Sequence, residues 1–193
     1  MTLATKQKVQ VTARAQWRAW LSENYTQADG IWLVTFKKHC GDRYVSYDAI
    51  VEEALCFGWV DSLPRKLDGD RTMLYISPRR QGSPWSRLNK QRVAKLLAQG
   101  LMTAAGQAKI DQAKADGSWT VYDEVEDLII PSDLAAALET DPTAKAHFQA
   151  FSDSAKKGIL WWLKSAKRAA TRQKRIDETV RLAAQNLKAN QPT

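Results

Sequence analysis

The sequence predicts an α+β protein that is mostly helical, with a small antiparallel sheet in the N-terminal half followed by a helical C-terminal half. Residues 31–36 and 59–77 carry short runs rich in β-branched and aromatic residues, bounded by turn residues. From residue 86 onward, apolar residues recur at helical spacing between capping residues and glycines. An acidic stretch at 123–127 divides the chain into lobes 1–120 and 121–193, which we expect to share one compact unit.

The N-terminal half begins with a helix from about Thr12 and continues with a strand over 31–36. The helix is indicated by one apolar stripe, formed by Ala13, Trp17, Trp20 and Leu21. A second helix over 47–57 follows Ser46, whose hydroxyl suits an N-cap, and Gly58 suits the left-handed position after its end.

Two strands over 59–66 and 71–77 then form a hairpin. Asp68 and Gly69 between them favour the positive φ angles that tight hairpin turns require.

The remaining chain is predicted to be helical, with Ser86, Thr103, Asp141 and Ser152 as helix caps. The last helix runs from about 171 to 187. We expect Pro131 and Pro142 in first turns, where a missing N–H costs nothing.

Composition places the chain among ordinary globular proteins. It has 193 residues, 44% hydrophobic, and a net charge of +8. No apolar run approaches the length of a membrane helix, and the N-terminus lacks the apolar core of a signal peptide. We therefore expect a cytoplasmic protein without membrane insertion. Its only cysteines, Cys40 and Cys56, are expected to be reduced, and Cys56 to lie in the core.

Residues 56–89 concentrate cations, tryptophans and hydroxyl groups around the predicted hairpin. Guanidinium groups can grip a phosphate or carboxylate with two hydrogen bonds, and the start of a helix attracts anions. The sequence thus predicts a binding site for a small anionic ligand or polyanion. Its residues are Trp59, Asp61, Arg71, Arg79, Arg80, Ser83, Trp85, Ser86 and Asn89.

The same residues also fit a purely structural junction. In that interpretation Asp61 pairs with an arginine across the hairpin, and the tryptophans seal the joint between sheet and helices.

No cofactor, metal site or established catalytic motif is predicted. The phosphate-binding glycine motifs and the serine elbow are absent. His39 and Cys40 are adjacent, and on an extended chain they would point to opposite faces. Glu52 and Glu53 are expected on a solvated helix face. An enzyme with Asp61 as general acid or base remains one alternative.

A nucleic-acid-binding protein is the other alternative. The C-terminal region carries a series of cations, which on a helical wheel fall opposite the apolar stripe: Lys164, Lys167, Arg168, Arg172, Lys174, Arg175 and Arg181. A solvated helix face explains them equally well.

Several motifs resemble the YdeI/OmpD-associated family, named for bacteriocin protection. They are the Lys37-Lys38 pair, VSYDAIVEEALCFGWVDS at 45–62, SPRR at 77–80, SPWSRLN at 83–89 and the tail around 166–176. The family often has isoleucine where this chain has Val60. The resemblance implies a bacterial cytoplasmic protein loosely linked to antimicrobial-peptide or stress resistance, and it implies no reaction or catalytic residue.

Overall fold

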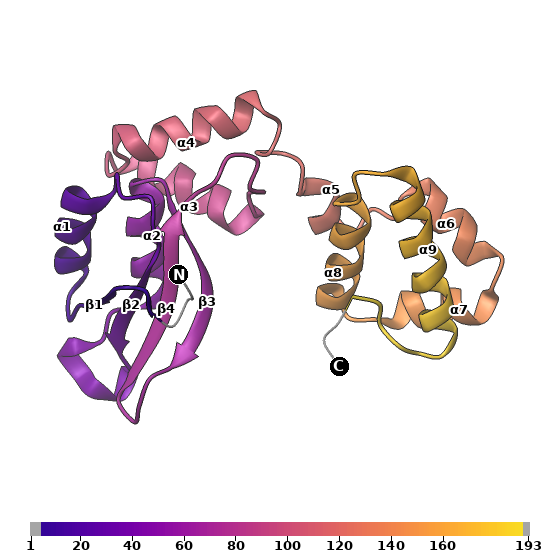
Figure 1. Cartoon of the computed structure of the whole chain (residues 1–193), viewed down its shortest axis with the longest axis horizontal. Coiled ribbons are helices and arrows are strands. Elements are labelled where there is room, and N and C mark those ends of the chain that lie inside the picture. Colours follow the sequence, from indigo (N-terminus) through magenta and orange to yellow (C-terminus); the bar gives the residue numbers. More distant parts are fainter. Residues whose placement is uncertain (1–4, 191–193) are drawn as a thin grey trace. The chain divides into compact units, whose positions relative to one another are not determined.

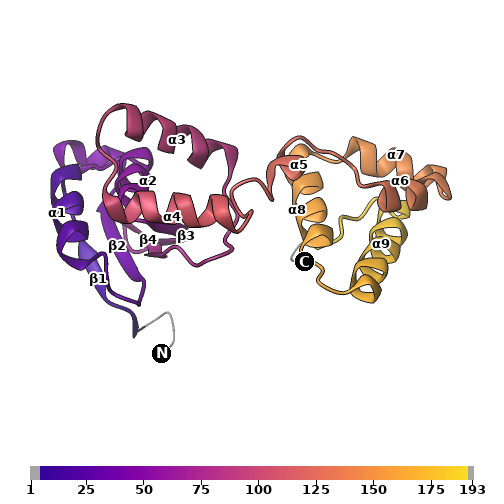
Figure 2. The same ribbon diagram turned by 90° about the horizontal axis from the view of Figure 1, so that it is seen from above.

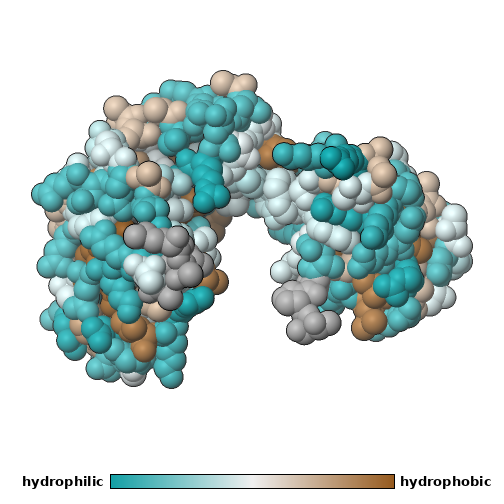
Figure 3. Space-filling view, in the orientation of Figure 1, coloured by the Kyte–Doolittle hydropathy of each residue, from teal (hydrophilic) through white to brown (hydrophobic). Residues whose placement is uncertain are grey.

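A computed structural model describes residues 5–190 of the chain. It divides into two compact units, 1–121 and 122–193, each with its own apolar core. Hydrophilic residues cover most of the visible surface of each unit, and small apolar patches lie among these residues (Figure 3). Among residues 5–190, no helix combines the length and apolar character that a membrane crossing requires.

The first unit contains one sheet and the helices around it (Figure 1). Its elements in chain order are β1 (Lys8–Gln10), α1 (Arg14–Asn24), β2 (Ile31–Phe36), the 3₁₀ segment η2 (Lys38–Arg43), α2 (Tyr47–Cys56), β3 (Trp59–Lys66), β4 (Arg71–Pro78), α3 (Arg87–Ala98) and α4 (Ala104–Ala115).

The sheet has the strand order β1-β2-β4-β3 and is mixed. The predicted strands pair antiparallel, β2 with β4 and β4 with β3. The strand β1 was not predicted, and it pairs parallel with β2. The α+β class is therefore confirmed, but the sheet is not purely antiparallel, because a short polar segment joins its edge.

Local signals fix the ends of α2 and the hairpin. The Oγ of Ser46 accepts a hydrogen bond from the N–H of Ala49, as an N-cap does. Gly58 follows the helix with a φ of 74°, so the predicted left-handed residue is confirmed. In the turn, Asp68 Oδ1 accepts hydrogen bonds from the N–H groups of Asp70 and Arg71.

The strand β3 lies at the edge of the sheet and is irregular. Its register against β4 shifts between Asp61 and Pro64. A proline has no N–H to donate to a ladder, and a register shift of this kind marks a β-bulge.

The helix α2 is the centre of the first unit, because it contacts α1, α3, α4 and β3 (Figure 1, Figure 2). The residues predicted to face inward, Ile50, Val51, Ala54 and Leu55, are all buried. Cys56 is fully buried and free, as predicted. The indole N–H of Trp17 in α1 donates to the carbonyl oxygen of Ile50 at 3.0 Å, which connects α1 to this helix.

The second unit is entirely helical in its described part. Its helices are α5 (Asp123–Glu126), α6 (Ser132–Glu139), α7 (Pro142–Ala150), α8 (Asp153–Lys164) and α9 (Ala169–Ala184). The predicted caps Asp141 and Ser152 accept hydrogen bonds from Ala144 and Ala155. Pro131 is the N-cap of α6 and not a first-turn residue, so that prediction was off by one position. The helix α9 contacts α6, α7 and α8 around Phe148, Ile159 and Ile176.

Candidate functional site

Arg79 and Trp85 lie together between the end of β4 and the start of α3. The guanidinium carbon of Arg79 is 3.8 Å from the centroid of the Trp85 ring. Both side chains are buried, with 4% and 1% exposure. Nη1 of Arg79 donates to the carbonyl oxygen of Pro84 at 2.9 Å and, at 3.4 Å, to that of Ser83. The pair therefore holds the 80–84 loop against the unit.

The surroundings of Arg79 are unusual for a charged group. Burial lowers its pKa to about 10, and the attraction of Asp61 opposes that shift. Arg79 forms no ion pair within 4 Å with the carboxylates of residues 5–190. Its charge is stabilised by the carbonyls of Ser83 and Pro84, by the ring of Trp85 and by the attraction of Asp61.

The neighbouring predicted residues have local roles. The Oγ of Ser86 caps α3 by accepting from the N–H of Asn89, whose own Oδ1 accepts from Arg92 at 2.9 Å. Arg80 and Ser83 line the same small recess as Arg79 and Trp85.

The other three predicted residues, Trp59, Asp61 and Arg71, do not line this recess. Trp59 is fully buried, and its indole N–H donates to the carbonyl oxygen of Tyr25 at 3.0 Å. Arg71 lies at the hairpin turn, where it pairs with Asp68 at 2.7 Å. Asp61 faces a separate pocket. The recess thus brings together Arg79, Arg80, Ser83 and Trp85, whereas Arg71 pairs with Asp68 at the hairpin turn.

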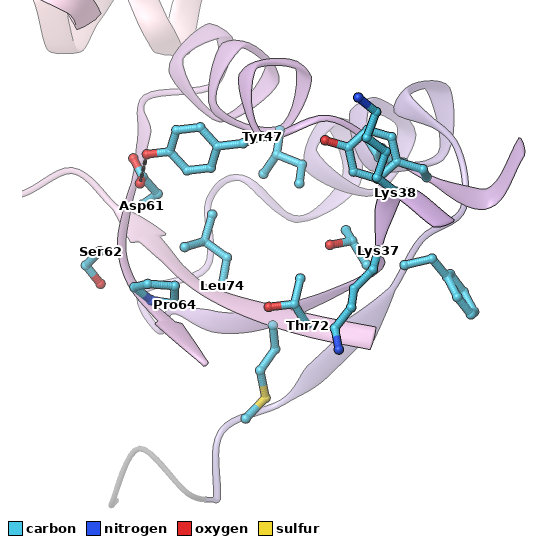
Figure 4. Close-up of a pocket in the computed structure, with 14 residues that line it drawn as sticks. Lys37, Lys38, Tyr47, Asp61, Ser62, Pro64, Thr72 and Leu74 are labelled. Atoms are coloured by element: carbon cyan, nitrogen blue, oxygen red, sulfur yellow. Dashed lines mark hydrogen bonds between the residues drawn. The ribbon is translucent and has the colours of Figure 1, made fainter. Parts of the chain in front are cut away.

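A pocket of the first unit lies between the sheet and the N-terminal end of α2 (Figure 4). Its volume is about 610 Å³, which suits a small organic ligand. Most of its surface is apolar. It is lined by Thr35, Phe36, Lys37, Lys38, Tyr44, Val45, Tyr47, Ile50, Asp61, Ser62, Pro64, Thr72, Met73 and Leu74.

One end of this pocket carries a tyrosine–aspartate pair. The hydroxyl of Tyr47 donates to Oδ2 of Asp61 at 2.6 Å (Figure 4). Burial and the hydrogen bond to Asp61 together raise the pKa of Tyr47 to about 12, so the phenol stays protonated at neutral pH. The second carboxylate oxygen of Asp61 has no hydrogen bond from residues 5–190 and can accept one from a ligand.

Two lysines lie at the other end of the pocket (Figure 4). Nζ of Lys37 donates to the carbonyl oxygens of Asp68 and Gly69, at 2.9 and 2.7 Å. Lys38 forms no hydrogen bond or ion pair with residues 5–190, so its ammonium group is available to an anion. The sequence-based site omitted Tyr47 and both lysines. The Ser46 cap was the one local signal, since it places Tyr47 at the start of α2.

Three potential metal ligands meet beside the hairpin turn. Nε2 of His39 lies 3.1 Å from Oδ1 of Asp70, and the ligand atoms of His39, Cys40 and Asp70 lie within 4.8 Å of one another. The argument that His39 and Cys40 point to opposite faces was wrong, because η2 is a 3₁₀ helix and not an extended chain. These are the residues of the described chain that could hold a soft metal ion.

Glu52 and Glu53 are also not on a solvated face. Their exposed fractions are 5% and 2%. Glu53 pairs with Arg14 and Arg18 of α1, at 2.6 and 2.7 Å, and Glu52 pairs with Lys95 of α3 at 2.6 Å. The two acids are buried because neighbouring helices supply cations that sequence spacing does not reveal.

The C-terminal cations are partly engaged within the second unit. Arg172 pairs with Asp133 at 2.5 Å, Lys164 pairs with Glu124 at 2.5 Å, and Arg175 stacks 4.9 Å above Trp162. The second unit contains 11 lysines and arginines against 10 acids, and the first unit 18 against 11. The charge excess therefore lies in the first unit.

Two family models match the chain. One is described as a domain of unknown function (DUF8412) and matches residues 9–109. The other is described as bacteriocin-protection, YdeI or OmpD-associated, and it matches residues 127–186. No curated protein and no solved structure matches the chain.

The motifs that resemble the YdeI/OmpD-associated family do not all lie within the match to that family. The tail around 166–176 lies within the match to that family, whereas the motifs at 45–62, 77–80 and 83–89 lie within the match to the domain of unknown function. The chain thus belongs to the DUF8412 family through more than half of its length, and its second unit carries a YdeI/OmpD-associated domain.

Proposed function

We propose that the first unit binds a small organic anion in the 610 Å³ pocket between the sheet and α2. The observation that carries this proposal is the arrangement of polar groups around an apolar cavity. Lys38, an exposed lysine, lines one end of the pocket with its nitrogen on the outer side, and the Tyr47–Asp61 pair lies at the other end (Figure 4). Such pockets bind the body of a ligand by apolar contact and orient it by few polar groups.

The two ends define the chemistry of the ligand. A carboxylate, sulfonate or phosphate would pair with Lys38, and an N–H or O–H group would donate to the free oxygen of Asp61. Between them the ligand would present an apolar body to Ile50 and Leu74. The excess of cations in the first unit favours the approach of an anion.

Anilinonaphthalene sulfonate is a suitable first probe, because it combines a sulfonate, an N–H donor and an apolar body. We expect its fluorescence to rise on saturable binding to the folded protein. Lys38→Gln should weaken binding about tenfold through loss of a charge-assisted hydrogen bond.

The matched control is Lys66→Gln, which removes the same charge from an exposed strand position outside the pocket. Equal weakening in both variants would show that the probe responds to net charge alone and would count against the pocket. Circular dichroism of each variant verifies that the fold persists.

A catalytic role for Asp61 is a second candidate, supported by its position on the pocket wall rather than in a sealed ion pair. Asp61→Asn keeps the size of the side chain and removes its ability to act as a base. Once a pocket ligand is known, turnover that survives in Asp61→Asn would exclude this role.

The description of the second family names bacteriocin protection, and we extend the proposal to a protective role against antimicrobial peptides or stress. In this proposal the protective effect requires that the anion is bound in the pocket. Cells that express Lys38→Gln should then survive a bacteriocin less well than cells that express Lys66→Gln.

A further inference from the structure

A histidine, a cysteine and an aspartate converge where η2 meets the turn of the hairpin. Nε2 of His39 lies 3.1 Å from Oδ1 of Asp70. Sγ of Cys40 donates to the carbonyl oxygen of Asp70 at 3.7 Å. The ligand atoms of all three side chains lie within 4.8 Å of one another. Two segments about 30 positions apart in the chain therefore bring an imidazole, a thiol and a carboxylate together.

The backbone holds these two segments together without help from the three side chains. The N–H of Lys37 donates to the carbonyl oxygen of Asp70 at 2.8 Å. Nζ of Lys37 donates to the carbonyl oxygens of Asp68 and Gly69 in the same turn. The turn is therefore fixed against the start of η2, and this preorganisation lowers the cost of ordering a ligand site there.

The separations between the three ligand atoms fit a tetrahedral zinc ion. Zn–N and Zn–O bonds of about 2.0–2.2 Å and a Zn–S bond of about 2.3 Å place the ligand atoms about 3.3–3.6 Å apart. The distance of 3.1 Å between His39 and Asp70 is close to this range, and no separation exceeds it by more than about 1.2 Å. The side chains of His39 and Asp70 are 60% and 65% exposed, so they have room to adjust.

The types of ligand favour zinc over magnesium or calcium. Those two ions prefer six or more oxygen ligands, and the cluster has a single carboxylate, whereas imidazole and thiolate suit zinc. One thiolate and one carboxylate supply two negative charges, which balance Zn²⁺ in a unit with an excess of cations. The neighbouring guanidinium of Arg71 is paired with Asp68 at 2.7 Å.

We propose that His39, Cys40 and Asp70 form a zinc site, with Nε2, Sγ and a carboxylate oxygen as ligands. Three protein ligands leave the fourth tetrahedral position open to water or to a further ligand. On binding, the thiol releases its proton to solvent, and the neutral imidazole exchanges its hydrogen bond to Asp70 for a bond to the metal. The ion then joins η2 to the hairpin turn. This proposal does not depend on anion binding in the pocket beside Tyr47.

Cobalt titration of the reduced, chelator-treated full chain tests the proposal, because Co²⁺ replaces zinc and absorbs light. We expect a thiolate-to-cobalt charge-transfer band that saturates at one ion per chain and disappears when Zn²⁺ is added. Cys40→Ser should abolish the band. Asp70→Asn should weaken cobalt binding at least about tenfold, since loss of even an outer-sphere partner costs that much.

The matched control is Asp42→Asn, which removes the same charge from η2 outside the cluster and should keep the wild-type cobalt affinity. Equal affinities of the folded Asp70→Asn and Asp42→Asn proteins would overturn the site. Absence of the band in the wild type, or its persistence in Cys40→Ser, would do the same.

Thiol labelling of the wild type gives a second readout that needs no variant. Zn²⁺ should protect Cys40 from a thiol reagent, because a metal-bound thiolate is not free to react, whereas Mg²⁺ should leave the labelling rate unchanged. Mass spectrometry of the peptides assigns the label to Cys40. An unchanged rate in zinc would show that His39 and Asp70 form an ion pair only, and it would overturn the proposal.

Discussion

Oε2 of Glu53 in α2 lies 2.7 Å from Nη1 of Arg18 in α1. The Glu53 side chain is 3% exposed, whereas that of Arg18 is 35% exposed. The acid is therefore the buried partner, and the cation reaches it from the rim of the unit. Because the Glu53 carboxylate is removed from water, the folded protein can bury it only when the cations of α1 pair with it.

We expect Glu53→Gln to lower the free energy of unfolding by about 2–3 kcal/mol, because Arg18 loses its charged partner and Arg14 keeps only its pair with Glu52. Urea unfolding measures this change. Glu23→Gln, an exposed acid at the end of α1, should change stability by less than about 0.5 kcal/mol. Equal effects of the two substitutions would contradict the buried network.

Because of Glu52, we expect the free energy of unfolding to depend on pH in the acid range. Burial alone raises the pKa of Glu52, but hydrogen bonds from Lys95 and Arg14 outweigh it, so the net pKa lies below the usual 4.5. A carboxyl group whose pKa is depressed in the folded state stabilises the protein above its unfolded pKa and loses this contribution as the pH falls through the folded value. Stability should therefore decline below about pH 4.5, and less steeply in Glu52→Gln. Urea titrations of both proteins from pH 6 to pH 3 measure the slopes, and equal slopes would contradict the role of Glu52.

The two cysteines should react at very different rates. Burial raises the pKa of Cys56, which is fully inaccessible, whereas Cys40 is partly exposed. A thiol reagent should label one cysteine of the native protein, and the second only in denaturant. Cys40→Ser should remove the fast phase; its persistence would show that α2 opens readily.

Two helical glycines should respond in opposite directions to the same substitution. A Cβ at Gly106 in α4 would lie 2.3 Å from the carbonyl oxygen of Cys56 and 2.7 Å from that of Leu55, so α4 would have to move away from α2. Gly106→Ala should cost more than about 2 kcal/mol, in the range of overpacked cores.

Gly158 in α8 is the matched control, since a Cβ there meets nothing within 4 Å. Gly158→Ala should stabilise the protein by about 0.5–1 kcal/mol, because alanine has the higher helix propensity. Urea unfolding of both variants measures the pair. Similar effects of the two alanines would refute the close contact between α4 and α2.

Local chemistry made much of the fold predictable from the sequence. Ser46 and Gly58 determine the two ends of α2 as predicted. The hairpin turn also lies where it was predicted, but neither Asp68 nor Gly69 has the positive φ that was expected, and the side chain of Asp68 stabilises the turn instead. The strand β1 was missed because its three residues are stabilised by pairing with β2, more than 20 positions away.

The candidate sites were harder to predict because their residues meet only in three dimensions. The pocket is assembled from β2, η2, α2 and both strands of the hairpin, and its lining residues are spread over positions 35–74. The stacking of Arg79 on Trp85 occurs within one short loop, so the sequence did bring that pair together. It could not show that Arg71 turns toward Asp68.

The irregular edge of β3 has a consequence for the behaviour of the protein at high concentration. An exposed, regular edge strand offers unpaired backbone groups to a second chain and promotes aggregation. The edge of β3 is not regular in this way. It is interrupted by the bulge and Pro64, and it carries the charged side chains of Arg65 and Lys66. The same irregularity that shapes one wall of the pocket thus disfavours extension of the sheet by a neighbouring molecule at the β3 edge.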